Sequence, residues 1–298
     1  MRTFVPRWFA ANDRRRDKGL TEPEDVIVFR DLRYSPDGEE GLLDIYLPAI
    51  PQEKHPVVIH THGGGFCYGD KNLYRFYCME IARQGFAVVN FNYRLLPALF
   101  PAPLEDLSSV IHFCTTHARE YALDMNNVSA VGDSAGALLT QMYAAALCNP
   151  SYRKLLPETF RKNLPAVTFK AVALHSSPFA REKFSSGSMK HLDVWLGKTK
   201  AERRKNWQAV QLADYAKGFP PAFITYSVND RIAVDSPRFA ESLRRAGVKC
   251  TIAAYGAEDK NVGYVFQLDV RSQLAKDCMA RQTAFFKSAL RSDQSENY

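Results

Sequence analysis

The chain has 298 residues, of which 46% are hydrophobic and 24% charged, and a net charge of +7. These values are typical of a globular protein with a sizeable core, and they exclude a disordered chain. The sequence has no apolar run of about 18 residues, and its charged start, MRTFVPRWFAANDRRRDKG, lacks the apolar segment of a signal peptide. We therefore expect a cytoplasmic protein without a membrane span.

Neither the charge nor the cysteines indicate a nucleic acid or a metal. The basic clusters at 14–16 and 198–207 accompany no nucleic-acid-binding motif, so we interpret them as a solvated arm and the polar face of a helix. The six cysteines show no paired spacing, which favours reduced and mostly buried thiols. We expect no nucleic-acid partner, no metal and no cofactor, and a homodimer is left open.

Strands and helices alternate along the chain. In chain order we expect two strands within 24–48, strand 56–62, helix 72–85, strand 87–94, helix 104–121, strand 127–132, helix 134–148, strands 168–174 and 222–227, helix 236–247, strand 248–255 and helix 271–291. This order predicts an α/β fold with a mostly parallel central sheet and helices on both faces. We expect one domain over 1–298, with an N-terminal arm at 1–25 and a charged, lid-like insertion at 176–218.

The segment VSAVGDSAGALL contains the pattern G-x-S-x-G as Gly132, Ser134 and Gly136, between a predicted strand and a predicted helix. A sharp strand-to-helix turn needs small residues on both sides of the serine and exposes its hydroxyl at the carboxyl end of the sheet. We therefore predict Ser134 as a catalytic nucleophile. The alternative is a serine that simply caps a helix.

The segment HTHGGGF places three consecutive glycines directly after another predicted strand. Such a run is costly in backbone entropy, so the close approach of bare N–H groups to a reacting group is a good reason for it. Acyl transfer needs two or three preorganised donors for an oxyanion. We assign the amides of Gly64, Gly65 and Ala135 to this oxyanion hole, with a flexible loop as the alternative.

Asp230 follows the strand ending at Ser227 and is the predicted acid, because the chain order of α/β-hydrolases is Ser, then Asp or Glu, then His. Asp235 is the nearby alternative, although its position fits a helix N-cap better.

Taken together, HGGGF, YRLLPALFPAPLED, GDSAG and VND resemble the hormone-sensitive-lipase-like esterases of the α/β-hydrolase family over about residues 40–290. The resemblance implies Ser134 as nucleophile, Asp230 as acid, the glycine amides as oxyanion donors, and a histidine in the loop after the last strand. That loop reads GYVF, so Tyr264 stands at the histidine position, and no histidine follows His191.

Tyrosine is a poor replacement for this histidine. The base should have a pKa near 7, whereas a phenol titrates near 10 and has one polar atom where imidazole has two nitrogens. Among the other histidines, His175 at a strand end is a minor candidate for a surrogate base. His62 is expected to shape the glycine loop, and His55 and His191 look peripheral.

Two functions of different kinds follow from these residues. The favoured one is a serine carboxylesterase for small or short-chain acyl esters, impaired at residue 264. The alternative is an inactive protein that binds a small ligand in the same pocket, as the plant gibberellin receptors do, which are similar to this group and lack the histidine. An acyl-peptide or formamide hydrolase is a smaller third alternative, because fold and triad do not determine the acyl substrate.

Overall fold

The architecture comes from a computed structural model, which describes residues 7–178, 190–233 and 235–295. Its centre is an eight-stranded sheet in the order β1-β2-β4-β3-β5-β6-β7-β8. The strands are β1 (Val26–Arg33), β2 (Leu42–Pro48), β3 (His55–Thr61), β4 (Ala87–Phe91), β5 (Leu123–Asp133), β6 (Phe169–His175), β7 (Ala222–Ser227) and β8 (Cys250–Tyr255). β2 is antiparallel to both β1 and β4, and all other pairings are parallel. The predicted mostly parallel sheet is confirmed.

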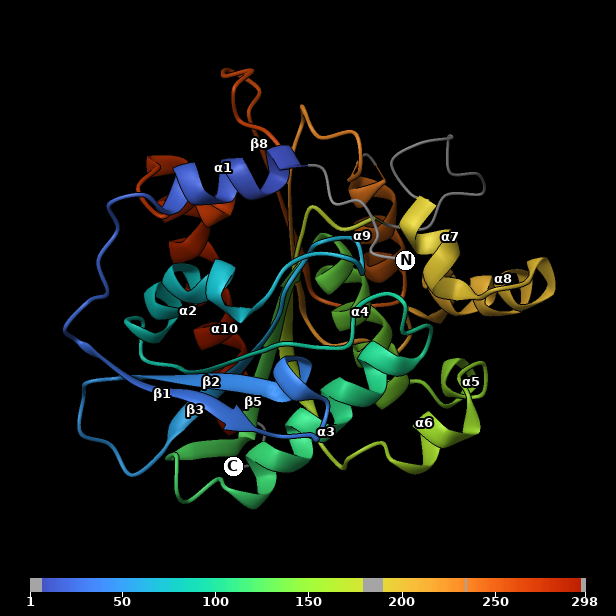
Figure 1. Ribbon diagram of the computed structural model, residues 1–298, viewed down its shortest axis with the longest axis horizontal. Coiled ribbons are helices and arrows are strands. Elements are labelled where there is room, and N and C mark those ends of the chain that lie inside the picture. The colour runs from blue at the N-terminus through green and yellow to red at the C-terminus, as the bar shows by residue number, and fades with distance from the viewer. Residues whose placement is uncertain (1–6, 179–189, 234, 296–298) are drawn as a thin grey trace.

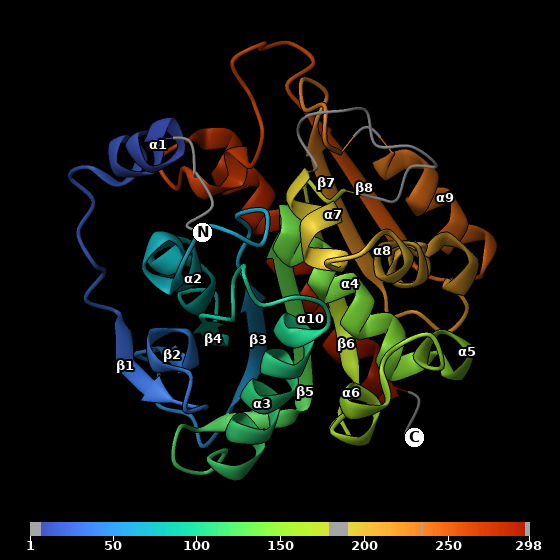
Figure 2. The same ribbon diagram turned by 45° about the vertical axis from the view of Figure 1, so that its right-hand side comes forward.

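Helices cover both faces of the sheet (Figures 1 and 2). One face is covered by α2 (Arg75–Ala82) and α10 (Gln273–Ser295), whose apolar residues form one core cluster with that side of the sheet. The other face is covered by α3 (Ala102–Thr116), α4 (Ser134–Cys148) and α9 (Ser236–Arg245), which belong to a second and larger cluster. The inner strands are buried on both sides, which explains their continuous apolar sequences.

Several helices differ from the sequence expectation. Helix 72–85 begins as a 3₁₀ turn, η2 (Lys71–Tyr74), and helix 104–121 ends at Thr116. The early end has a physical reason, because β5 already pairs with β3 at Leu123 and the chain must turn before it. The short helices α1 (Arg7–Asp17), α5 (Pro150–Arg153) and α6 (Glu158–Lys162) were not predicted.

The block between β6 and β7 holds α7 (Lys190–Leu196), α8 (Lys200–Trp207), η3 (Gln208–Val210) and η4 (Ala213–Tyr215). These elements fall within the segment predicted as a lid, of which residues 179–189 lie outside the described part. Two further 3₁₀ turns are η1 (Gly38–Gly41) and η5 (Phe266–Leu268).

The register of the parallel strands positions the site. Thr61 is paired with Gly132, Asp133 with His175, and His175 with Thr225, so the strands end at one edge of the sheet. The loops that follow β3, β5, β7 and β8 therefore meet at this edge, where open α/β sheets bind ligands.

All six cysteines are free thiols, as expected, but only three of them are buried: Cys78, Cys114 and Cys278. Within the described ranges, none of the helices has both the length and the apolar character that a bilayer crossing requires.

Candidate active site

Ser134 lies at the sharp turn between β5 and α4. Its backbone φ is +51°, in the left-handed region that residues with side chains rarely adopt. A Cβ atom at Gly132 would lie 2.6 Å from the carbonyl carbon of Gly136, and one at Gly136 would lie 2.0 Å from the Thr61 carbonyl oxygen. The turn therefore requires glycine on both sides of the serine, as the G-x-S-x-G spacing predicts.

The three glycines after β3 are not equivalent. The Gly63 amide donates to the Tyr74 hydroxyl at 3.0 Å and to the Asp133 carboxylate at 3.1 Å. Gly64 and Gly65 both have positive φ, at +115° and +62°, and no hydrogen bond among the described residues uses either amide. Within the described part of the chain, the Gly64 and Gly65 amides thus have no hydrogen-bond acceptor.

Tyr264 lies in the loop after β8, with its phenol facing the Ser134 hydroxyl. Burial of the phenol raises its pKa above the usual range, the negative charges of Asp133 and Asp230 raise it further, and the Ser134 hydroxyl partly opposes the rise. The next residue, Val265, has a φ of +51°. A left-handed conformation is unusual for a β-branched residue, so this loop holds Tyr264 in place at a cost in backbone strain.

Asp230 is 4% exposed and follows β7. Its Oδ1 atom accepts the Ile232 amide at 2.7 Å, whereas its Oδ2 atom is buried and has no hydrogen-bond partner in the described part of the chain. Burial raises the pKa of this carboxyl, and the bond from the Ile232 amide opposes the rise. A buried carboxylate oxygen without a donor is energetically costly, so the site lacks a donor at this point.

The structure brings Ser134, Tyr264 and Asp230 to one edge of the sheet, together with the glycine loop. Asp235 stands at the N-cap position of α9, as expected, but its side chain makes no capping bond there.

Asp133 is a residue of this site that the sequence reasoning missed. It is 3% exposed and accepts the Tyr74 hydroxyl at 3.2 Å in addition to the Gly63 amide. Burial raises the pKa of its carboxyl to about 7, against these hydrogen bonds. The signal was present in the sequence, because a carboxylate beside the serine of a buried turn needs partners. Asp133 and Tyr74 hold the start of the glycine loop against β5.

Two buried histidines, His62 and His175, lie near this edge of the sheet. His62 is fully buried, stacks on Tyr93 at 4.2 Å and bonds the Gly63 carbonyl oxygen at 2.6 Å, so it shapes the glycine loop as expected. Both ring nitrogens of His175 are engaged, Nδ1 by Thr225 and Nε2 by Gln282 at 2.5 Å. Burial lowers the pKa of His175 to about 4. It is therefore a structural histidine on the α10 side of the sheet.

His191 corrects the sequence expectation, which placed it at the periphery. It lies on α7, and its Nδ1 atom would be 3.8 Å from a Cβ atom at Gly65. The tertiary packing of α7 on the glycine loop brings it there. The anchor of this packing is Trp195, whose fully buried ring stacks on Phe66 at 4.1 Å and 4°.

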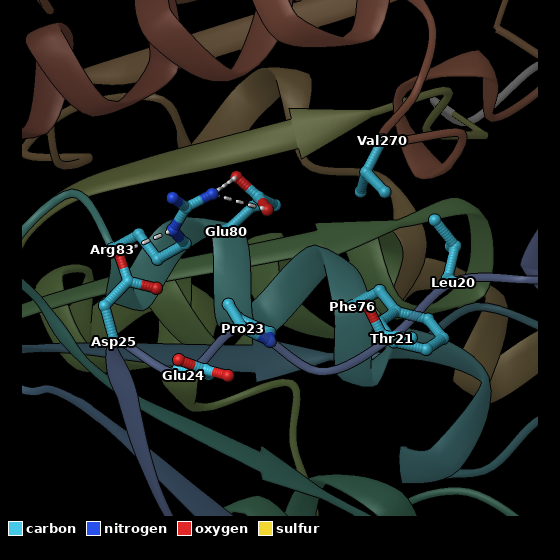
Figure 3. Close-up of a pocket in the computed structure, with 9 residues that line it drawn as sticks. All are labelled: Leu20, Thr21, Pro23, Glu24, Asp25, Phe76, Glu80, Arg83 and Val270. Carbon is cyan, nitrogen blue, oxygen red and sulfur yellow. Dashed lines mark hydrogen bonds and ion pairs between the residues drawn. The ribbon is translucent and has the colours of Figure 1, made fainter.

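A separate cavity of about 450 Å³ lies between the segment 20–25, α2 and Val270 (Figure 3). Its polar lining is occupied by its own ion pairs, since Arg83 bonds Asp25 at 2.9 Å and Glu80 at 3.2 Å. None of its lining residues belongs to the edge described above. Among the described residues, no group of three or more His, Cys, Asp or Glu side chains is placed to hold a metal ion.

Comparisons with known proteins point to esterases. The family model described as BD-FAE matches residues 43–242. The chain is 30% identical to Esterase LipI of Mycobacterium tuberculosis over 240 residues, which covers 77% of this chain and 72% of that protein. It is 28% identical to Carboxylesterase NlhH of the same organism over 253 residues, covering 80% and 78% of the two chains.

Among solved structures, an inhibited Esterase B from Lactobacillus rhamnosis superposes with a TM-score of 0.86 at 24% identity, covering 98% of this chain and 96% of that one. This likeness shows that the two chains share one fold over nearly their whole length.

Proposed function

The chain belongs to the hormone-sensitive-lipase-like esterases of the α/β-hydrolase family, and on this basis we propose that it is a carboxylic ester hydrolase that uses a serine acyl-enzyme on small or short-chain acyl esters and is impaired by Tyr264. Its scaffold is that of a serine carboxylesterase. The finer proposal assigns Ser134 as the nucleophile, Asp230 as the acid, and the amides of Gly64, Gly65 and Ala135 as the oxyanion donors. A cytoplasmic location is part of the same proposal.

The observation that carries the proposal is the Asp230 Oδ2 atom, which is buried and finds no donor among the residues that the structure describes. In a working triad this carboxylate accepts an N–H from the catalytic base and orients it. The Tyr264 phenol faces Ser134 and not this oxygen, and it has a single polar atom, so it cannot bond the acid and the nucleophile as an imidazole does. The unpartnered oxygen is what a missing imidazole would leave behind.

The chemical step follows from these roles. Ser134 Oγ attacks the ester carbonyl, the carbonyl oxygen becomes an oxyanion, and the free glycine amides stabilise it. The serine proton needs an acceptor near neutral pH, but the raised pKa of Tyr264 keeps the phenol protonated. Attack is therefore slow, and no protonated base is present to donate a proton to the leaving alcohol oxygen.

The experiment measures hydrolysis of a chain-length series of p-nitrophenyl esters by the wild type and by Tyr264→His. We expect kcat of Tyr264→His to rise by several orders of magnitude on short chains with little change in KM, because the gain lies in the transition state. Ser134→Ala in the Tyr264→His background should abolish the gain. Equal rates for the wild type and Tyr264→His would contradict the proposal, and loss of wild-type activity in His175→Ala or His191→Ala would identify a surrogate base.

The second candidate function is binding of a small ligand without turnover. It is favoured by the same phenol, because Tyr264 stays protonated and so remains a hydrogen-bond donor beside Ser134. A site that has hydrogen-bond donors but no general base binds a ligand through its acceptor group and does not cleave that ligand. Tight binding of a small ligand, with no esterase activity in either the wild type or Tyr264→His, would support this function.

A further inference from the structure

The segment from Lys198 to Lys205, which includes most of α8, carries a dense positive charge. Five basic residues stand within eight positions, with one carboxylate among them: Lys198, Lys200, Arg203, Arg204 and Lys205, and Glu202. Arg203 is half-buried and the other four are exposed. We call these five basic residues the basic lid surface.

The basic lid surface lacks the local pairing of other exposed helices. Lys162 pairs with Glu158 at 2.8 Å and Arg245 with Glu241 at 3.0 Å, each at i,i+4 spacing. Within the described ranges, none of the five basic residues forms an ion pair. Glu202 offsets only part of this charge, and its carboxylate also accepts the amides of Lys198 and Thr199 at 2.8 and 3.0 Å in a capping box.

Helix stability explains only Arg204 and Lys205, which stand in the last turn of α8, where the helix dipole favours cations. Lys198 and Lys200 flank the N-terminus of α8, where the helix dipole disfavours cations. The repulsion among neighbouring cations adds to that cost. An external anionic surface would offset both effects.

A chain of contacts connects the basic lid surface to the glycine loop of the candidate site. The Asn206 side chain of α8 bonds the Leu196 carbonyl of α7 at 2.7 Å. Trp195 of α7 stacks on Phe66, directly after the glycine loop, and its carbonyl accepts the Phe100 amide at 2.9 Å. Figure 1 shows α7 beside the carboxyl ends of the strands and α8 extending away from the body of the molecule. An object bound by α8 is therefore linked through α7 to the glycine loop.

The adjoining face of α7 exposes an apolar side chain, since Val194 is 45% exposed. Basic side chains beside an exposed apolar residue match the chemistry of a lipid surface, in which anionic head groups border acyl chains. The cytoplasmic leaflet of cell membranes carries anionic lipids, so the charge of the surface and the proposed location agree.

We propose that the basic lid surface docks on an anionic lipid surface and so presents esters dissolved in that surface to the candidate site. This inference rests on the proposed function for its substrate, but the docking itself does not depend on turnover. Each basic residue near such a surface contributes roughly fivefold in binding, and the attraction is screened by salt.

The test is co-sedimentation of the full chain with vesicles of phosphatidylcholine alone and of phosphatidylcholine with phosphatidylglycerol. The test variant is Lys200→Glu, Arg204→Glu, Lys205→Glu. Its matched control, with the same change in net charge, is Lys154→Glu, Arg161→Glu, Lys162→Glu at the exposed turn of α5 and α6. We expect the wild type and the control to bind only the anionic vesicles and to dissociate as salt rises, whereas binding of the test variant falls at least about a hundredfold.

Hydrolysis of a soluble p-nitrophenyl ester in the Tyr264→His background separates the two proposals. Unchanged hydrolysis with lost vesicle binding supports docking by this surface. Equal vesicle binding by the test variant and the control overturns it, as does binding of phosphatidylcholine vesicles as strongly as anionic ones. Binding of RNA that follows the same variants, without vesicle binding, would identify a nucleic-acid surface instead. Vesicle binding without esterase activity in any variant leaves the docking standing and overturns the proposed function.

Discussion

The Tyr264 phenol faces the Ser134 hydroxyl, so two hydroxyl groups meet at the turn between β5 and α4. Burial and the charges of Asp133 and Asp230 hold the pKa of the phenol high. Both members of the pair therefore stay protonated near neutral pH, and neither activates the other.

The first prediction concerns the leaving group. The wild type should hydrolyse p-nitrophenyl acetate slowly and ethyl acetate almost not at all, because a good leaving group needs no proton from a base. An oxyanion hole and binding alone retain a rate of about 10³–10⁴ over water. Tyr264→His should reduce the difference in hydrolysis rate between p-nitrophenyl acetate and ethyl acetate. A wild type that cleaves both esters at similar rates would show that a base is present.

The second prediction concerns the unpartnered oxygen of Asp230. In the wild type, Asp230→Asn should change kcat little, because no base depends on this carboxylate. In the Tyr264→His background the same change should lower kcat by about 10³–10⁴, since the acid then orients the imidazole. The kcat values of the wild type, the two single variants and the double variant form a double-mutant cycle.

Asp235→Asn is the matched comparison for this cycle, because Asp235 follows the same strand and is the alternative acid that the sequence offers. It should have little effect in either background. A large effect of Asp235→Asn and a small one of Asp230→Asn would exchange the roles of the two carboxylates.

The third prediction concerns the turn at Ser134. A Cβ atom at Gly136 would lie 2.0 Å from the Thr61 carbonyl oxygen and 2.4 Å from that of His62, and both atoms are backbone. Gly136→Ala should lower the free energy of unfolding by about 3 kcal/mol or more, as overpacking against an immobile backbone does. Urea unfolding followed by circular dichroism measures it.

Gly19→Ala is the control, since a Cβ atom there meets nothing within 4 Å and the cost comes from its φ of +80° alone. That cost is about 1–2 kcal/mol. Equal losses for the two variants would mean that the turn relaxes around the added methyl group.

The fourth prediction concerns the pH dependence of stability at Asp133. Burial raises the pKa of its carboxyl to about 7 in the folded chain, against about 4 in the unfolded chain. The folded state thus favours the protonated form, so this stabilisation is complete below about pH 4 and is lost as pH rises to about 7. Between pH 5 and 8 the wild type should lose about 2.5 kcal/mol of unfolding free energy relative to Asp133→Asn.

Urea titrations at several pH values measure this slope. Asp193→Asn, which makes the same charge change on an exposed position of α7, should run parallel to the wild type. A wild type that gains stability relative to Asp133→Asn as pH rises would show that hydrogen bonds outweigh burial at this carboxyl.

The sequence by itself determined the order of the main strands and helices along the chain and the turn at Ser134. The parallel strands have continuous apolar runs because both of their faces are buried, and helix periodicity marks their connections. The pattern of Gly132, Gly136 and the glycines after β3 is also visible in the sequence, although the atoms that exclude a side chain at Gly136 belong to the distant residues Thr61 and His62. The absence of a histidine after residue 191 needs no structure at all.

Only the tertiary structure decided which groups meet. The Gly63 amide bonds Asp133, 70 residues away, and His175 bonds Gln282 across 107 residues. His191 reaches the glycine loop because Trp195 packs on Phe66. The unpartnered oxygen of Asp230 is visible only once β7 and β8 lie side by side. Local sequence patterns reflect interactions within one segment. These contacts depend instead on how distant segments pack and on which buried polar atoms then find partners.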